Sequence, residues 1–381
     1  MLSTLKSSLK VSLVSLILIF SLTAVSRAHR HSSYFREDGK QVDNPDWMSL
    51  LPNNVHLSEL SIPGTHESLS RHSGGVVPLD LVKTQSMALK FQLESGIRAL
   101  DVRCAIVGRS FNIYHGNIYQ KESFDGVLST VVKFLIDHPS ETVLMRVKQE
   151  RTDQPGTFLE IFRQTYWKNV KYQSYIPKGM SLNPTLREMR GKIVILQDFA
   201  RWQCETPFSK AEFGVCYNSF DIQDQFQVRG NTALYDKWLA VKNQLDRANK
   251  GFNGFDAKFM NYLSGVGVTD TWGVPNPYFV VSGHVNPATG ADRERTHLRA
   301  STNQWPDFPR LNYRGTEYIY YEGMNTLVYD FIRNGHFTKR VGIIMTDFPG
   351  GGLIERIICI NYPKTDPLCQ RLPPCEGPLC R

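Results

Sequence analysis

Four short segments between Ser61 and Glu150 carry most of the residues that could do chemistry in this chain. They are Ser61-Ile62-Pro63-Gly64-Thr65-His66-Glu67, Leu100-Asp101-Val102-Arg103, Tyr114-His115-Gly116 and Val147-Lys148-Gln149-Glu150. The unperturbed pKa of histidine, about 6.5, lets His66 and His115 act as a base and an acid in one reaction. An arginine beside them can neutralise a phosphate with a bidentate fork. The combination indicates acid–base chemistry at a phosphodiester.

Two of these segments contain charged residues two positions apart. In a strand this spacing puts both side chains on the same face. Asp101 and Arg103 form one such pair, and Lys148 and Glu150 form the other. A structural ion pair is the alternative interpretation of the first pair, and a solvated pair at a strand end is the alternative for the second. A solvated loop residue is the alternative for each histidine. Far downstream, Asp347 ends an apolar run and could fix the tautomer of a catalytic histidine, as in a triad, or could merely cap a helix.

The elements that must position these residues alternate between short apolar runs and helical patterns. Expected strands are Leu57–Ile62, Ile97–Cys104, Phe111–Tyr114, Thr142–Val147, Lys192–Leu196, Phe259–Leu263 and Arg340–Met345. Expected helices are Gln85–Ser95, Phe124–Asp137, Phe158–Trp167 and Asn325–Asn334. Alternation over about 300 residues predicts a parallel βα barrel, whose active site lies at the carboxyl ends of the strands. Because Arg201–Gly254 is less regular, we expect a distorted α/β barrel of the TIM type, in a single catalytic domain.

With these residues in place, the chain resembles the secreted, bacterial-type phosphatidylinositol-specific phospholipases C of the X type. The resemblance runs from about Leu51 to about Ile354 and depends on the four segments above, in order and spacing. It implies a distorted βα barrel that cleaves phosphatidylinositol to diacylglycerol and a 1,2-cyclic inositol phosphate.

The same resemblance implies a role for each catalytic residue. His66 would deprotonate the inositol 2-hydroxyl, with Asp347 behind it, and His115 would protonate the leaving glycerol oxygen. Arg103 would stabilise charge on the phosphoryl oxygens, braced by Asp101. Glu67 would support His115, although the family pattern usually has aspartate at this position.

On the substrate side, the resemblance implies that Lys148 and Asp224 contact inositol hydroxyls and that Glu150 ties this side together. Phe226 stands where a tyrosine that stacks on inositol is usual, so stacking is kept and a hydroxyl is lost. Asp198 lies near the expected place of a ligand-binding arginine, which suggests that headgroup recognition differs here.

The arginine also bears on metal use. In calcium-dependent relatives a carboxylate cluster holds the ion near the place of Arg103, so we expect no metal or other cofactor. One alternative is a metal-dependent glycerophosphodiesterase or sphingomyelinase-D-like barrel, which would need several carboxylates around a cation. Another is a catalytically dead module that only binds lipid.

The N-terminus has the features of a secretory signal peptide. Lys6 and Lys10 precede the apolar run Val11–Ala24, and small residues suggest cleavage after Ala28. A retained signal anchor is the alternative. We therefore expect a signal peptide over residues 1–28, a polar lead over 29–50, the catalytic barrel over 51–355, a tail rich in cysteine and proline over 356–381, and export from the cell.

Charge and cysteines complete the picture. Removing the three basic residues of the signal lowers the net charge from +8 to +5, which favours anionic membrane surfaces weakly, and no motif points to nucleic acid. Trp272 and the apolar stretch Val76–Val82 are candidates for membrane contact. In an exported protein the seven cysteines are disulfide candidates; we expect a Cys204–Cys216 pair and a buried, free Cys104.

Overall fold

The computed structural model describes residues 31–74, 81–151, 154–254, 256–267, 276–284, 297–299, 304–334 and 339–370. The fold discussed below is that of the unit that begins at Ser32. The expected signal peptide, Trp272, Val76 and the last two cysteines lie outside the described residues. Within the described part, no helix combines the length and apolar character needed to cross a membrane.

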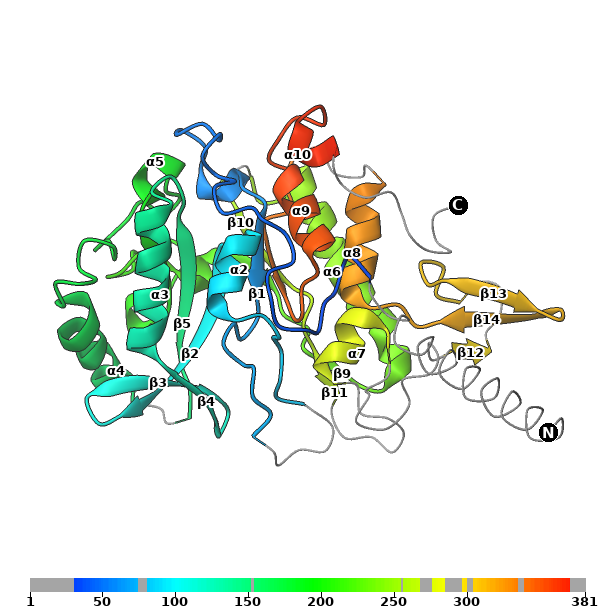
Figure 1. Ribbon diagram of the computed structural model, residues 1–381, viewed down its shortest axis with the longest axis horizontal. Helices are drawn as coiled ribbons and strands as arrows, with labels where there is room; N and C mark the ends of the chain where they lie inside the picture. Colours follow the sequence, from blue (N-terminus) through cyan, green and yellow to red (C-terminus); the bar gives the residue numbers. More distant parts are fainter. Residues whose placement is uncertain are drawn as a thin grey trace, which may run out of the picture. The chain divides into compact units, whose positions relative to one another are not determined.

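Eight parallel strands form the body of the fold (Figure 1). They are β1 (Ile62–Thr65), β2 (Ala99–Val107), β5 (Val143–Gln149), β6 (Ile193–Asp198), β7 (Val215–Cys216), β8 (Phe220–Gln223), β10 (Lys258–Tyr262) and β15 (Ile343–Thr346). Their order is β7-β6-β5-β2-β1-β15-β10-β8, and every neighbouring pair in this order is parallel. Because β7 and β8 are the two ends of this order, the barrel is nearly closed rather than fully closed, which confirms the expected distorted barrel.

Helices lie outside the strands (Figure 1), and most of them contribute buried apolar residues to the two main hydrophobic clusters of the fold. They are α2 (Leu89–Ser95), α3 (Phe124–Asp137), α4 (Pro155–Ile161), α5 (Leu186–Met189), α6 (Leu234–Lys250), α7 (Pro277–Ser282), α8 (Met324–Arg333), α9 (Gly351–Cys359) and α10 (Pro367–Gln370). Short turns of other helix types are η1 (Leu57–Glu59), η2 (Phe162–Trp167), η3 (Arg201–Gln203), η4 (Tyr217–Ser219) and η5 (Asn231–Ala233). Helix α3 shows the local logic: the Ser123 hydroxyl accepts a hydrogen bond from the Gly126 amide at 3.1 Å, and an apolar stripe follows.

A β-hairpin is attached to the edge of barrel strand β2. Strand β3 (Ser110–His115) runs antiparallel to β2, and β4 (Ile118–Ser123) runs antiparallel to β3. The turn between β3 and β4 contains Gly116 with φ +54°, a conformation that suits glycine. His115 therefore ends a strand that folds back over the barrel, instead of ending a barrel strand.

Two small sheets lie outside the barrel, one with a parallel strand pair and one with two antiparallel pairs. β9 (Gln227–Val228) pairs with β11 (Val266–Gly267). A separate antiparallel sheet contains β12 (His297–Arg299), β13 (Arg310–Tyr313) and β14 (Thr316–Tyr320). The sequence did not predict either sheet.

The two largest errors in the predicted boundaries are at the starts of a strand and of a helix. The expected strand Leu57–Ile62 begins instead at Ile62, because the Glu59 carboxylate accepts the His56 amide at 2.8 Å and closes a turn of helix over η1. The expected helix Gln85–Ser95 begins at Leu89. Residues 162–167, expected to continue a regular helix, form a π-helical turn.

The cysteines agree with the expectation where the structure describes them. Cys204 and Cys216 form a disulfide, and Cys104 is buried and free. A second disulfide joins Cys359 and Cys369, and the sequence did not predict this pairing. Helix α9 spans the expected boundary between the barrel, which was expected to end at residue 355, and the tail, which was expected to begin at residue 356.

Candidate active site

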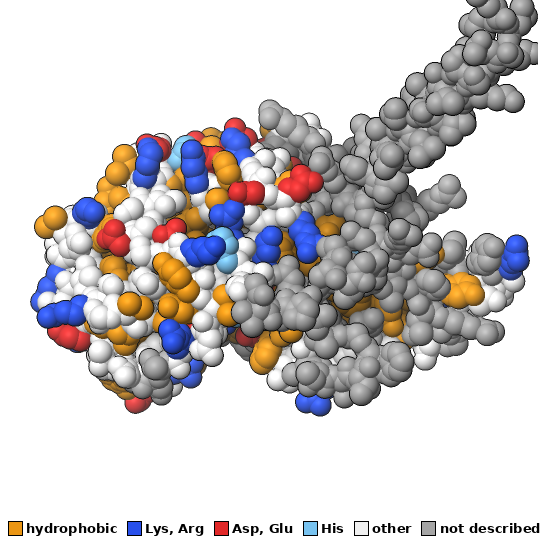
Figure 2. Space-filling model, turned by 60° about the horizontal axis from the view of Figure 1, so that its bottom comes forward, with side chains coloured by type: hydrophobic (Ala, Val, Ile, Leu, Met, Phe, Trp, Pro, Cys, Tyr) orange, Lys and Arg blue, Asp and Glu red, His pale blue; other side chains and the backbone are white. Residues whose placement is uncertain are grey.

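The predicted site residues meet in a pocket of about 280 Å³ at the carboxyl ends of the barrel strands. Eight of the ten residues predicted from the sequence line it: His66, Glu67, Arg103, His115, Lys148, Asp224, Phe226 and Asp347. The other two, Asp101 and Glu150, contact residues that line the pocket. Figure 2 shows Lys and Arg side chains next to a histidine on the face of the molecule that is turned forward there.

Close packing at the start of the site explains the Pro-Gly-Thr-His stretch. A Cβ atom on Gly64 would lie 2.5 Å from Met345 Sδ and 2.8 Å from Ala99 Cβ, so only glycine lets β1 pack between its neighbours. Glu67 and Phe348, which follow His66 and Asp347, both have positive φ (40° and 44°). The chain therefore turns sharply after each of these two strands, directly beyond the polar residue.

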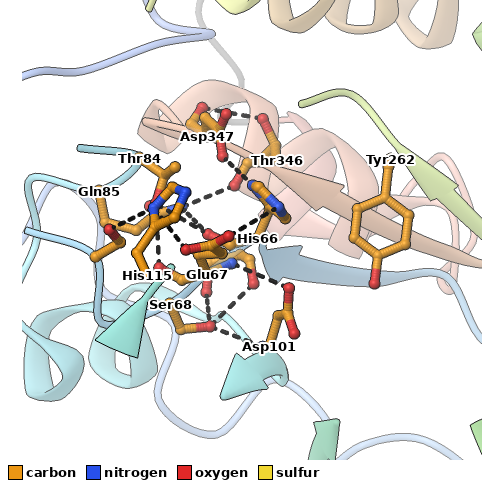
Figure 3. A network of polar contacts seen from close by, with 12 residues as sticks. His66, Glu67, Ser68, Thr84, Gln85, Asp101, His115, Tyr262, Thr346 and Asp347 are labelled. Atoms are coloured by element: carbon orange, nitrogen blue, oxygen red, sulfur yellow. Dashed lines mark hydrogen bonds and ion pairs between the residues drawn. The ribbon is translucent and has the colours of Figure 1, made fainter. Parts of the chain in front are cut away.

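His66 faces the carboxylate of Asp347 (Figure 3) on one side and the guanidinium of Arg103 on the other. Its Nδ1 is 2.9 Å from Asp347 Oδ1, and its Nε2 is 2.9 Å from Arg103 Nη2. Because arginine can only donate, Nε2 accepts, and Nδ1 carries the proton. This is the neutral tautomer with its lone pair on Nε2, which is the form that a general base needs.

The pKa of His66 is raised above its ordinary value. Burial alone would lower this pKa, but the charge and hydrogen bond of Asp347 outweigh both burial and the repulsion of Arg103. Asp347 is itself fully buried, and burial raises the pKa of its carboxyl while His66 lowers it.

His115 has a different set of neighbours. Its Nδ1 lies 2.8 Å from the Val82 carbonyl oxygen, 3.0 Å from Ser70 Oγ and 2.7 Å from Glu67 Oε2. The Glu67 contact is an ion pair whose direction falls outside hydrogen-bond geometry, so the Val82 carbonyl is the better-placed acceptor. Ser70 donates its own proton to the Val82 carbonyl at 2.7 Å. All three atoms around Nδ1 can accept, so Nδ1 is protonated.

The hydrogen bonds between His115 and the residues that the structure describes all involve Nδ1, and none involves Nε2. This nitrogen therefore belongs to the pocket, which the side chain lines. In the imidazolium form it would carry a second N–H, ready for a ligand.

Glu67 connects the two histidines and the arginine. Its Oε1 is 2.5 Å from Arg103 Nη1 and 3.8 Å from His66 Nε2, and its Oε2 faces His115. Burial alone would raise the pKa of Glu67, but the opposing effects of Arg103 and His115 are larger and lower this pKa below its ordinary value. The carboxylate therefore stays ionised.

Arg103 is fixed from a second side by Asp101, whose Oδ2 accepts from Nη2 at 3.3 Å and from Nε at 3.4 Å. Asp101 is fully buried, and Arg146 and Arg103 hold the pKa of its carboxyl far below the usual range against the effect of burial. The guanidinium of Arg103 is thus held in place before any ligand binds.

The remaining predicted residues form the opposite side of the pocket. Lys148 Nζ is 3.9 Å from Glu150 Oε2, and burial lowers the lysine pKa. Glu150 Oε1 accepts the Gly116 amide at 3.0 Å and so ties the β3–β4 turn to β5. Asp224 is exposed just past β8, and Phe226 is 51% exposed at the pocket edge.

Sequence reasoning missed several lining residues, above all Arg146, Thr84 and Ser264. Arg146 lies two positions before Lys148 on β5, so it shares a strand face with a residue that was predicted, and this spacing could have found it. Asp198 binds Arg146 through Nε at 3.0 Å and Nη2 at 2.8 Å, so its carboxylate is engaged by protein.

In the residues that the structure describes, no cluster of three or more His, Cys, Asp or Glu side chains could hold a metal ion. The carboxylates of the pocket are instead matched by basic side chains, as Glu67 and Asp101 are by Arg103.

Comparison with known proteins relates the chain to phosphatidylinositol-specific phospholipases C. Residues 60–198 match the family model for the X domain of phosphatidylinositol-specific phospholipase C. The 1-phosphatidylinositol phosphodiesterase of Listeria monocytogenes is 29% identical over 273 residues, which cover 70% of this chain and 83% of the relative. An enzyme of the same name from Staphylococcus aureus is 29% identical over 301 residues, which cover 74% of this chain and 87% of the relative.

The solved structures lead to the same family. The phosphatidylinositol-specific phospholipase C from Listeria monocytogenes superposes with a TM-score of 0.59 at 26% identity, covering 84% of this chain and all of that chain. The fold and these matches point to the same enzymes: residues 60–198 match the X-domain family model, and the chain as a whole is similar to bacterial phosphatidylinositol-specific phospholipases C.

Proposed function

We propose that this protein is a secreted phospholipase C that cleaves phosphatidylinositol to diacylglycerol and 1D-myo-inositol 1,2-cyclic phosphate. The names of the bacterial relatives support the substrate. The two histidine environments support the chemistry. One observation carries the proposal. His66, whose Nε2 accepts a hydrogen bond from Arg103, and His115, whose Nε2 makes no hydrogen bond to a described residue, line the same pocket, and Glu67 lies between them.

The first half of the reaction is removal of a proton. His66 Nε2 takes the proton of the inositol 2-hydroxyl, and the resulting oxygen attacks the neighbouring phosphorus. Asp347 accepts the Nδ1–H, which keeps the lone pair on Nε2 and stabilises the imidazolium that forms. Since the nucleophile belongs to the substrate, no bound water has to be positioned.

The second half is departure of the lipid. His115, protonated on both nitrogens, donates the Nε2 proton to the glycerol oxygen as its bond to phosphorus breaks. Diacylglycerol leaves, and the phosphate remains as a cyclic diester on the inositol. Glu67 Oε2 lies 2.7 Å from His115 Nδ1, so a carboxylate holds the ring on the side away from the donating Nε2.

Arg103 stabilises the charge that develops between these steps. Its guanidinium donates to His66 Nε2 at rest, so binding of a phosphate moves this donation to the phosphoryl oxygens and frees the lone pair. Glu67 and Asp101 hold the guanidinium during this exchange. Base and acid each contribute a factor on the order of 10²–10⁴.

The headgroup occupies the side formed by Lys148, Asp224 and Phe226. Lys148 and Asp224 contact ring hydroxyls, Phe226 stacks on the ring, and Glu150 fixes the turn beside them. The basic side chains here and at Arg103 supply positive charge without a metal ion, so we propose metal-independent catalysis.

Export is proposed from the N-terminal sequence pattern and from the disulfides, which persist in oxidising compartments. The substrate then lies in a membrane surface that the enzyme approaches from outside. The Val82 backbone, at the end of the apolar stretch expected to contact membranes, also holds His115.

Phosphorus NMR of the products from phosphatidylinositol vesicles tests the proposal. We expect a cyclic phosphodiester signal with the native protein and no such signal with His66→Ala. Only an acyclic monophosphate at early times, or no turnover by the native protein, would contradict the proposed function.

A further inference from the structure

Arg146 is the one pocket residue that is both charged and set into the pocket floor without a role in the reaction above. It lies on β5, its side chain is 8% exposed, and it lines the same pocket as His66. Partners from the two neighbouring strands and from a more distant one surround it: Asp101 on β2, Asp198 at the end of β6, and Tyr262 at the end of β10.

The hydrogen bonds of this guanidinium can be counted. Nε and Nη2 donate to Asp198 Oδ2 at 3.0 and 2.8 Å. Nη1 donates to the Tyr262 hydroxyl at 3.0 Å and to both oxygens of Asp101 at 3.4 Å. An arginine has five N–H groups, so one hydrogen on Nη2 has no acceptor among the described residues.

The guanidinium is also fixed in its plane. The Tyr217 ring lies 4.2 Å from Cζ, and the Tyr217 hydroxyl is 2.9 Å from that of Tyr262. Asp198 and Asp101 on two sides and the ring of Tyr217 on one face together hold the Arg146 guanidinium in a single orientation. A donor held this way can select for the position of an acceptor, because it cannot turn to follow a misplaced one.

Structural stability alone gives a weak reason for this arrangement. Buried ion pairs often add little to stability compared with apolar side chains of similar volume. A buried donor with a missing acceptor is costly, and a ligand in the pocket would supply the acceptor.

We infer that Arg146 is a specificity-determining residue for the headgroup, donating its remaining Nη2–H from the pocket floor to a ring hydroxyl of the bound inositol. The inference rests on the proposed function for the identity of the headgroup. Asp198 is then a positioning residue, because it acts by holding two N–H groups of Arg146. This explains why a carboxylate stands at a place where a ligand-binding arginine was expected: the guanidinium comes from β5, and β6 supplies its anchor.

The test compares four variants of the full chain: Arg146→Met, Arg146→Lys, Asp198→Asn and, as a matched control, Arg163→Met. Arg163 forms a bidentate pair with Glu212 outside the pocket, at 2.9 and 2.5 Å. The readouts are kcat and KM on phosphatidylinositol in mixed micelles, and the inhibition constant of free myo-inositol. Thermal unfolding identifies any variant that fails to fold; Arg146→Lys, which keeps the charge, then takes the place of Arg146→Met.

We expect Arg146→Met to raise KM and the inhibition constant of myo-inositol by about 10- to 100-fold, with a smaller fall in kcat. Arg146→Lys gives an intermediate effect, because an ammonium group cannot replace the planar fork. Asp198→Asn raises both constants by a smaller factor, and Arg163→Met changes neither.

A panel of monodeoxy inositols sharpens the assignment. The native protein should discriminate against one member of the panel, and Arg146→Met should lose that discrimination while keeping any other.

Three outcomes would overturn the inference. Equal falls in kcat and kcat/KM with an unchanged inhibition constant would mean that Arg146 acts only through Asp101 and Arg103. Unchanged constants, or no inhibition of the native protein by myo-inositol, would remove Arg146 from headgroup recognition. If the native protein binds myo-inositol but does not cleave phosphatidylinositol, the proposed function fails. Dissociation constants of the deoxy inositols, measured by direct binding, then still decide the role of Arg146.

Discussion

The two histidines of the pocket are alike in sequence context but differ in their surroundings. Each lies at the end of a strand next to a turn, yet His66 has both ring nitrogens engaged, by Asp347 and Arg103, whereas His115 has only Nδ1 engaged. His66 is placed by a barrel strand, and His115 by a hairpin attached to the barrel. The partners, rather than the residue type, distinguish the base from the acid.

The difference also shows how one carboxylate can serve both sides. Glu67 contacts Arg103, which faces the base, and His115, which is the acid, so one carboxylate positions both groups. The predictions below test this division of roles, from the largest expected effect to the smallest.

The largest effect is expected from removing either imidazole. His66→Ala and His115→Ala should each lower kcat on phosphatidylinositol by about 10²–10⁴-fold, because each removes one proton transfer. The double variant should lose little more than the worse single variant, since the two groups act in one concerted process. Initial rates in mixed micelles measure this, and full additivity would argue against coupled action.

Asp347→Asn is expected to have the next largest effect, about 10²–10³-fold in kcat/KM, because the amide no longer stabilises the imidazolium. It should also move the pH profile. Asp347 raises the pKa of His66, and a base must be neutral to act, so native activity should rise with pH through a value above 6.5. Removing the negative charge lowers the pKa of His66, and the acid limb should shift to lower pH. An unshifted or upward-shifted limb would show that Asp347 does not control the base.

Glu67→Gln should lower kcat by about 10- to 100-fold, because it removes a charge-assisted contact to Arg103 and the negative charge at His115. Glu67→Asp keeps the charge, but the side chain is one methylene shorter and cannot reach both partners equally. We therefore expect a loss of only several-fold. If the glutamine variant were as active as the aspartate variant, the charge of Glu67 would have no part in catalysis.

The smallest effect is expected from chelation. EDTA should leave the rate on phosphatidylinositol unchanged, because Arg103 already supplies the positive charge beside Glu67 and Asp101. Loss of activity in EDTA that calcium restores would refute metal independence and favour the metal-dependent alternative.

The sequence predicted the parts of the site that depend on local pattern. Residues two apart on a strand share a face, which brought Asp101 together with Arg103, and strand ends in a parallel barrel meet at one rim. The twelve-residue separation of Cys204 and Cys216 likewise made a local disulfide recognisable.

What the sequence did not predict depends on long-range packing. Arg146 and Tyr262 lie within apolar strands, so the sequence pattern alone indicates core positions. Only the fold shows that Asp198 on β6 and Tyr262 on β10 bind the guanidinium of Arg146. The opening between β7 and β8 and the Cys359–Cys369 pairing depend equally on contacts between distant segments.

The most direct test of the division between base and acid changes the leaving group instead of the protein. A soluble inositol phosphodiester with a nitrophenol leaving group needs no protonation at the departing oxygen but still needs its 2-hydroxyl deprotonated. We predict that this substrate restores most of the activity of His115→Ala and none of that of His66→Ala. Equal rescue of both variants, or rescue of His66→Ala alone, would contradict the assignment of the two imidazoles.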